Sequence, residues 1–214
     1  KFAPFASLFN WQPVAIFNPK GTEIRLNKNQ AGSFWELPPS DNSEPSNFQL
    51  RVNLIRSAKI VFSPGETTLL AKGNIALNFA KKKIYGAINL DSRKHGNLYI
   101  AGKGNWDGLD FQTKARINKL RLGFLQGILG DDSNIITQGG INGNLNFGIK
   151  KGLIKCKGDL SINNLSLRGG ILSDILSTDK TRIKCDNKSL KITDSNWRYG
   201  YWDISNSAEI PFYK

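Results

Sequence analysis

Residues 97–117 read NLYIAGKGNWDGLDFQTKARI, and this stretch decides the fold class. Apolar residues or glycine alternate with polar ones on both sides of Asp107-Gly108. Such alternation is typical of a β-strand with one apolar and one solvated face. An Asp-Gly pair between two such runs is a strong signal for a tight hairpin turn, because both positions tolerate a positive φ. The stretch therefore predicts an antiparallel hairpin.

The same alternation continues along most of the chain and is clear over residues 74–79 and 141–149. Short turn sequences separate the runs, at residues 81–83, 93–96 and 150–152. Connections this short leave no room for crossover helices, so each strand is expected to pair with the next. The pattern predicts a mainly β protein, an elongated antiparallel meander, and excludes a doubly wound α/β fold.

A weak repeat runs through these strands, in which glycine is followed by a polar or small residue and then by alternating aliphatic residues. It occurs at Gly73, Gly86, Gly143 and Gly158. Each of these glycines shares the parity of the apolar residues and so lies on the apolar face. Glycine at such a position marks a bend or a close approach of backbone. The repeat predicts stacked hairpins that curve.

Two stretches depart from the alternation. Residues 119–130 and 170–177 carry apolar residues at a helical spacing, and we expect a short helix near each. Residues 38–47 form a polar loop rich in Pro, Ser and Asn. The loop separates a leading β-segment, residues 1–37, from the repeated hairpin region, residues 48–214.

Composition bounds the class of protein. The chain has 214 residues, 39 % of them apolar, which is typical of a folded protein once glycine is added. No apolar run approaches the ~18 residues of a membrane-spanning helix. The sequence has no Met and starts at Lys1, so we expect a fragment of a longer, envelope-spanning protein whose anchor lies outside this segment.

The formal net charge of +13 leaves two interpretations open. Such an excess attracts anionic partners. Its densest runs, at 81–83, 93–94 and 150–151, fall in expected turns, where lysines form a solvated rim and protect sheet edges. Aromatic residues are not interleaved with these runs, as single-strand binders require, so we expect no nucleic acid partner.

The sequence offers little catalytic or metal-binding chemistry. Cys156, Cys185 and a single histidine, His95, are too few for a Cys/His metal site, so we expect no metal and no cofactor. Asp131-Asp132 and His95 fall in expected turns, and Gly102-Lys103-Gly104 lies inside a strand. We therefore expect no enzyme. One disulfide is possible in an oxidising compartment, but two buried thiols are favoured, because nothing in the pattern brings the two cysteine strands together.

The apolar face of such a sheet needs a cover that two short helices are too small to provide. The sheet can close into a barrel, fold into a sandwich, or curve into a trough that holds an apolar ligand. The inward glycines favour the trough. The side chains expected to line it are Leu77, Phe79, Ile88, Leu90, Ile100, Trp106, Phe111, Ile117, Leu145, Phe147, Leu160 and Ile162.

The chain resembles the AsmA-like superfamily, most closely the TamB family and its cyanobacterial and plastid members. The resemblance rests on the Gly-x-aliphatic-x-aliphatic strands and on the order of elements from residue 115 onward. Those elements are a strand, the 119–130 helix, strands at 139–149 and 153–162, residues 163–165, the 170–177 helix, strands at 181–186 and 190–194, and residues 197–200. Residues 15–19 and 34–37 also look like early strands of the family.

The resemblance implies a fold and a function. Such proteins are anchored in the inner membrane, span the envelope, and enclose a U-shaped apolar groove, called a β-taco, that carries phospholipid toward the outer membrane. We therefore expect a lipid-binding periplasmic segment, or a plastid intermembrane one. The alternative is a scaffold for outer-membrane β-barrel protein assembly or secretion with a BamA-like partner. A third hypothesis is an unrelated β-domain that binds an anion or a glycan.

Overall fold

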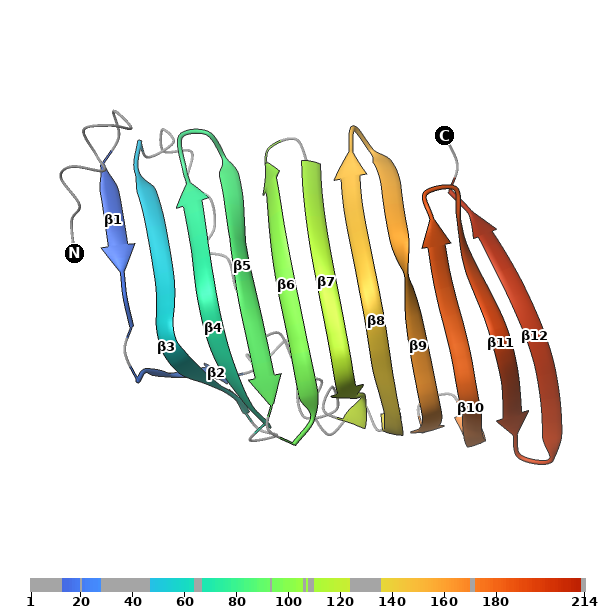
Figure 1. The fold of residues 1–214 in the computed structure, drawn as a ribbon. Helices are drawn as coiled ribbons and strands as arrows, with labels where there is room; N and C mark the ends of the chain where they lie inside the picture. Colours follow the sequence, from blue (N-terminus) through green and yellow to red (C-terminus); the bar gives the residue numbers. More distant parts are fainter. Residues whose placement is uncertain are drawn as a thin grey trace.

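The computed structural model describes residues 13–19, 21–27, 47–63, 67–92, 94–105, 107, 110–123, 136–169 and 172–212. These residues form one open sheet of twelve strands (Figure 1). The strands are β1 (Val14–Phe17), β2 (Glu23–Asn27), β3 (Gln49–Ser63), β4 (Thr67–Asn78), β5 (Lys83–Ser92), β6 (Gly96–Asn105), β7 (Asp110–Arg121), β8 (Ile136–Lys150), β9 (Leu153–Gly169), β10 (Leu172–Asp186), β11 (Ser189–Tyr199) and β12 (Trp202–Pro211). Within the described ranges, no helix is long and apolar enough to span a bilayer.

The expected meander is confirmed from β3 onward. Each strand from β3 to β12 pairs with the next in antiparallel register. β1 and β2 instead run parallel to β3, and they occupy successive halves of its outer edge. The leading segment therefore adds two strands to the same sheet rather than forming a unit of its own. Residues 28–46, which include most of the expected polar loop, lie outside the described part.

The helix expected over residues 170–177 is wrong where the structure describes it. Leu172–Ser177 belong to β10, and Leu176 lies opposite Leu167 of β9. A short stretch with scattered apolar residues fits a strand as well as a helix, and here pairing with β9 decides between them. β9 and β10 are antiparallel partners from Gly169 and Leu172 onward and form a long hairpin.

The helix expected over residues 119–130 is wrong at its start, and residues 124–130 lie outside the described part. Lys119–Arg121 complete β7. Lys119 has a positive φ of 49°, and the β7–β8 register shifts between Ile117 and Leu120. This β-bulge moves Leu120 back to the apolar face opposite Ile141. The bulge therefore explains why Leu120 departs from the alternation of β7, and residues 124–130, which carry the rest of the helical spacing, stay untested.

Similar irregularities cross the sheet in the neighbouring strands. Asn164 of β9 and Asp194 of β11 also have positive φ values, of 50° and 53°. Register shifts accompany them in the β8–β9 and β11–β12 pairs. Bulges in antiparallel pairs bend the bulged strand and increase its twist. The parity of the side chains is therefore reset part-way along β7, β9 and β11, whereas β5 and β6 pair in unbroken register.

The best-buried side chains gather at the β3–β4 end. Ala58, Val61 and Ala71 are almost fully buried. Leu69 of β4 packs in one cluster with Leu120 of β7, although two strands separate β4 from β7 in the sheet. The lower ends of β3 and β4 curve in Figure 1, which brings them toward the later strands. The sheet therefore covers part of its own apolar face at this end.

Candidate functional site

The apolar face consists of rows of side chains that run across the strands. Residues directly opposite each other in neighbouring strands lie on the same face, so the strand registers define each row. One row contains Leu54, Gly73, Ile88, Ile100, Ala115, Leu145, Gly158, Cys185, Leu190 and Ile210. The next contains Ala58, Ala71, Leu90, Leu98, Ile117, Gly143, Leu160, Ile183, Ile192 and Ala208. Neither row contains a polar residue.

The registers bring most of the expected lining residues together on this face. They are Leu77, Ile88, Leu90, Ile100, Phe111, Ile117, Leu145, Phe147, Leu160 and Ile162. Phe79 lies in the turn after β4, where its ring stacks on that of Phe48 with centroids 4.4 Å apart. Trp106 lies outside the described part. The sequence therefore identified a continuous surface, and residues of β10–β12 extend it.

Exposure of this surface differs along the sheet. None of the described apolar side chains of β5, β6 and β8 is buried. Ile100 and Phe147 are each 37 % exposed. A hollow of about 250 Å³ opens beside Ile88, Ile100 and Phe111. It lies over the directly paired Gly86 and Gly102, which present no side chain to the solvent.

The repeat glycines are required by the close approach of paired strands. Gly73 lies opposite Ile88, and Gly86 lies opposite Ile75. A Cβ atom added to either glycine would overlap a backbone carbonyl oxygen of the facing strand. Gly143 and Gly158 repeat this arrangement in β8 and β9. The expected close approach of backbone is confirmed, and its partner is the neighbouring strand.

A cluster of hydroxyl groups interrupts the apolar face in β10 and β11. The Oγ1 atoms of Thr178 and Thr181 are 3.3 Å apart, and Ser195 donates its hydroxyl to Thr181 at 3.0 Å. Thr178 also donates to the carbonyl of Lys180 at 3.1 Å. All three hydroxyl residues are buried and satisfy one another. The sequence analysis missed this cluster. For Ser195 the reason is a bulge: strict alternation with Ile192 predicts the solvated face, and the register shift between Ile192 and Ser195 turns the side chain inward.

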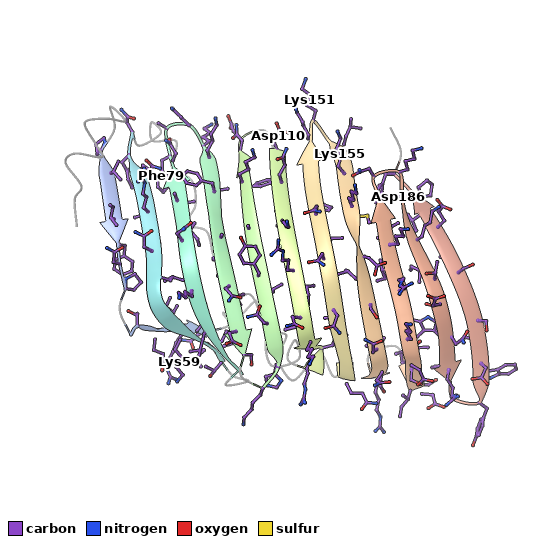
Figure 2. The ribbon with its side chains drawn as sticks, in the orientation of Figure 1. Lys59, Phe79, Asp110, Lys151, Lys155 and Asp186 are labelled. Carbon is purple, nitrogen blue, oxygen red and sulfur yellow. A yellow bond between two sulfur atoms is a disulfide. The ribbon has the colours of Figure 1, made fainter. Side chains whose placement is uncertain are left out.

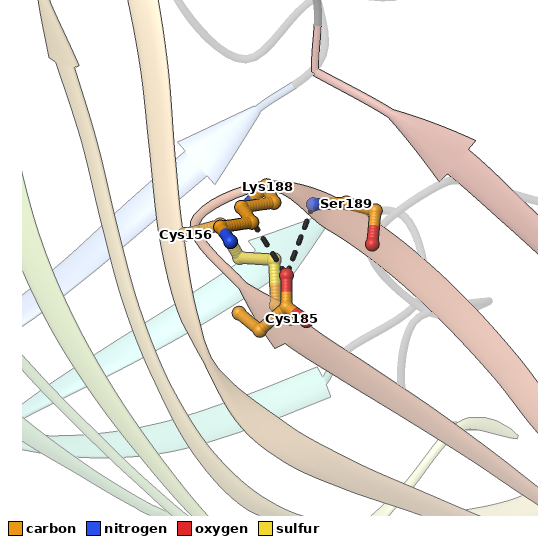
Figure 3. Close-up of a disulfide and its surroundings, with 5 residues drawn as sticks. Cys156, Cys185, Lys188 and Ser189 are labelled. Atoms are coloured by element: carbon orange, nitrogen blue, oxygen red, sulfur yellow. Dashed lines mark hydrogen bonds between the residues drawn. A yellow bond between two sulfur atoms is a disulfide. The ribbon is translucent and has the colours of Figure 1, made fainter.

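Cys156 and Cys185 form a disulfide, so the expectation of two thiols is wrong (Figure 3). The error follows from the misassigned helix. With β10 a strand, Cys185 lies opposite Gly158, two residues from Cys156. The two Cα atoms are 5.5 Å apart, within the usual range for a disulfide. Both cysteines are buried on the apolar face, as their parity predicted.

The opposite face is polar and rich in lysine. Lys114 lies opposite Asn146, and Asp159 lies opposite Asn144. The guanidinium of Arg116 lies over the ring of Tyr99, 5.8 Å from its centroid. The sheet thus separates an apolar from a charged surface by the thickness of one backbone layer.

Carboxylates with altered acidity lie at the ends of strands and not on the apolar face. Hydrogen bonds from Lys59 and Arg25 lower the pKa of Glu23. The backbone N–H groups of Ser189 and Lys188 lower the pKa of Asp186. Each shift is explained by local hydrogen bonds in a turn or between neighbouring strands. Within the described ranges, no three His, Cys, Asp or Glu side chains are grouped so as to hold a metal ion.

Comparison with protein-family models, with curated proteins and with solved structures finds no match for this chain. The geometry of the apolar face and the chemistry of its side chains therefore have to support any proposal about function.

Proposed function

We propose that the chain is a lipid-binding segment that holds phospholipid acyl chains on its apolar face. One observation carries this proposal. Rows of apolar side chains continue across ten strands, while those of β5, β6 and β8 stay partly exposed and no described element covers them. Soluble proteins rarely leave a contiguous apolar surface of this kind open without a ligand or a partner.

The dimensions suit acyl chains. Ten strands spaced ~4.8 Å apart span about 45 Å. An acyl chain in a bilayer spans about 15 Å, half of the hydrocarbon core. Such a face accommodates several chains in succession. The inward packing of Leu69 against Leu120 favours a curved, groove-like shape at one end.

A periplasmic or plastid intermembrane location agrees with the disulfide, because disulfides persist in oxidising compartments. The proposed place of the chain is a segment of an inner-membrane-anchored, AsmA-like bridge of the TamB type. In that setting, phospholipid moves along the apolar face between the inner and outer membranes.

Two adjacent residues of β8 provide a matched test. Phe147 lies on the apolar face and Asn146 on the polar one. We expect Phe147→Asp to remain folded, because the side chain is 37 % exposed, and to lose co-purifying phospholipid measured by mass spectrometry. Asn146→Asp makes the same change in charge on the other face and is expected to keep the lipid. Equal lipid in the two variants, or none in the wild type, contradicts the proposal. Unfolding of Phe147→Asp would instead indicate a closed, dry core.

The scaffold hypothesis has its own supporting feature, the outer edge of β12. Among the described strands, β12 pairs only with β11, and its Ile204 and Ile210 are exposed. An open sheet edge accepts a further strand through backbone hydrogen bonds. A photo-crosslinker at exposed Ser207 of β12 would capture an outer-membrane β-protein or a BamA-like partner. If the crosslinker still captures the partner when Phe147→Asp has removed the lipid, the scaffold role is separate from lipid binding.

A further inference from the structure

A second surface with binding chemistry lies on the polar face, opposite the proposed lipid surface. A hollow of about 570 Å³ opens over β5–β9. Four lysines line it: Lys103, Lys114, Lys155 and Lys157. Its volume is within the range of small-molecule sites. Lys155 and the β8–β9 turn that carries Lys151 lie toward the same end of the sheet (Figure 2).

The register explains why a hollow forms there. Lys103, Gln112, Gly148 and Lys155 follow one another across β6, β7, β8 and β9. Because Gly148 has no side chain, the surface of the polar face is depressed in the middle of this row, and a long cationic side chain stands at each end. In the next row, Ala101 is short, and Lys114 and Lys157 flank Asn146. The two rows together make a shallow floor surrounded by ammonium groups.

The charges around the hollow are unbalanced. Its lining includes no carboxylate, and none of its four lysines belongs to an ion pair within the described part of the chain. Other cations are paired, such as Lys59 with Glu23 at 2.8 Å and Lys82 with Asp107 at 2.7 Å.

Three carboxylates come near the hollow. Asp110 of β7 lies one row along from Gln112, accepts the backbone N–H of Lys151 at 2.9 Å and does not line the hollow. The other two also have partners. Asp186 lies opposite Lys157, and it accepts the backbone N–H groups of Lys188 and Ser189 at 3.1 and 3.0 Å. Asp159 lies one row further along β9, 3.8 Å from Arg182. Neither carboxylate lines the hollow. The cationic character of the lining is therefore left for a ligand to balance.

We propose that this hollow binds a ligand with two or more phosphate charges. Ammonium groups form charge-assisted hydrogen bonds with phosphate oxygens, and the side-chain amides of Gln112 and Asn146 supply further donors. The backbones of Lys103 and Lys155 are separated by three strand spacings, about 14 Å. The ammonium groups therefore surround the hollow instead of meeting at one point, which favours a diphosphate or a pair of headgroups over one monoanion. The four lysines belong to the polar face, whereas Gly86, Gly102 and Phe147, which also line the hollow, belong to the rows of the apolar face. The site is therefore tested through its lysines, which the proposed lipid surface does not use.

The test is titration of the whole chain with inorganic pyrophosphate at constant ionic strength, followed by calorimetry. The triple variant Lys103→Gln, Lys114→Gln and Lys155→Gln is expected to bind at least about tenfold more weakly. The control Lys72→Gln, Lys83→Gln and Lys184→Gln removes the same charge from exposed strand positions outside the hollow and is expected to stay within about twofold of wild type. Circular dichroism checks that both variants are folded.

Phosphatidylglycerol vesicles distinguish the possible sources of the phosphate. Competition between vesicles and bound pyrophosphate assigns a membrane headgroup, and pyrophosphate binding that vesicles leave unchanged assigns a soluble ligand. Both results support the site if the triple variant loses the binding. Absence of saturable pyrophosphate binding, or equal weakening in the triple variant and its control, overturns it.

Discussion

Two positions of one cross-strand row behave differently. Leu54 of β3 and Ile100 of β6 lie on the same face and in the same row, three strands apart. Leu54 is 7 % exposed and Ile100 is 37 % exposed. On this face β3 and β4 hold the buried cluster of Leu54, Ala58 and Ala71, whereas β5, β6 and β8 bury no described apolar side chain. Equal alternation in sequence thus produces a packed region where the sheet covers itself and an open one where it does not.

Glycine substitution is expected to have the largest effect, and the same effect in both regions. Gly73 and Gly143 have φ values of 147° and 140°, and an added Cβ would overlap a backbone oxygen of the adjacent strand. Each Gly→Ala change is expected to cost about 3–5 kcal/mol, from backbone strain plus overlap. Urea unfolding measures both. The overlap arises between paired strands within the sheet, so it does not depend on whether other side chains pack over the apolar face. A large difference between the unfolding free energies of the two variants would contradict this explanation.

Gly152 is the control for that pair. It has a positive φ of 75° in the β8–β9 turn, and no atom lies within 4 Å of an added Cβ. Gly152→Ala is expected to cost only about 1 kcal/mol, for the left-handed conformation alone.

Loss of the disulfide is the next largest change. It joins residues 29 apart in the sequence, and replacing both cysteines by alanine is expected to reduce the free energy of unfolding by about 3–4 kcal/mol. The stability of the later strands then comes in part from a covalent bond between β9 and β10, whereas the stability of the packed region comes from buried side chains. A reduced wild type should unfold at the same urea concentration as the double variant. An unchanged midpoint would show that the bond does not form in solution.

The row comparison itself is tested by two truncations. Leu54→Ala removes a buried side chain and is expected to cost ~2–3 kcal/mol. Ile100→Ala removes a side chain that is already partly solvated, with an expected cost of about 1 kcal/mol. Similar costs would mean that Ile100 is covered in solution, by lipid or by a partner, and delipidation before unfolding should then restore the difference.

The smallest effect concerns pH at the packed end. Glu23 of β2 accepts hydrogen bonds from Lys59 of β3 at 2.8 Å and from Arg25 at 2.7 Å, and both lower its pKa. A lowered pKa in the folded state means that this stabilisation is present above pH 4.5 and is lost as the pH falls through the folded-state pKa. Glu23→Gln should therefore flatten the dependence of the urea midpoint on pH below 4.5. Because the pair is exposed, the change is expected to be small.

The sequence predicted the strands wherever alternation was unbroken. Over residues 73–78, 86–90, 97–105, 110–117 and 141–162, parity assigned the faces that the registers show. It failed where a bulge inserted one residue. Lys119 shifted Leu120 by one position, so that Leu120 no longer followed the alternation of β7. Bulges have no strong sequence signature, since a lysine or an asparagine at positive φ looks like any polar residue.

Long-range consequences of those errors were also missed. Once residues 172–177 were read as a helix, β9 and β10 no longer formed a hairpin, and the disulfide had no geometric basis. A hairpin centred on the glycines at 169 and 170 would have brought Cys156 close to Cys185. The lysine hollow depends likewise on register: residues from five strands meet there, and no local stretch of sequence contains the set.

The disulfide has a mechanical consequence. A pulling force on the two ends of the chain passes through Cys156 and Cys185, whose Cα atoms are 5.5 Å apart, and bypasses the 28 residues between them. Fully extended, that bypassed segment would measure roughly 100 Å. The oxidised chain is therefore shorter by about this length at full stretch, and the β9–β10 loop stays shielded from load after the surrounding strands have separated.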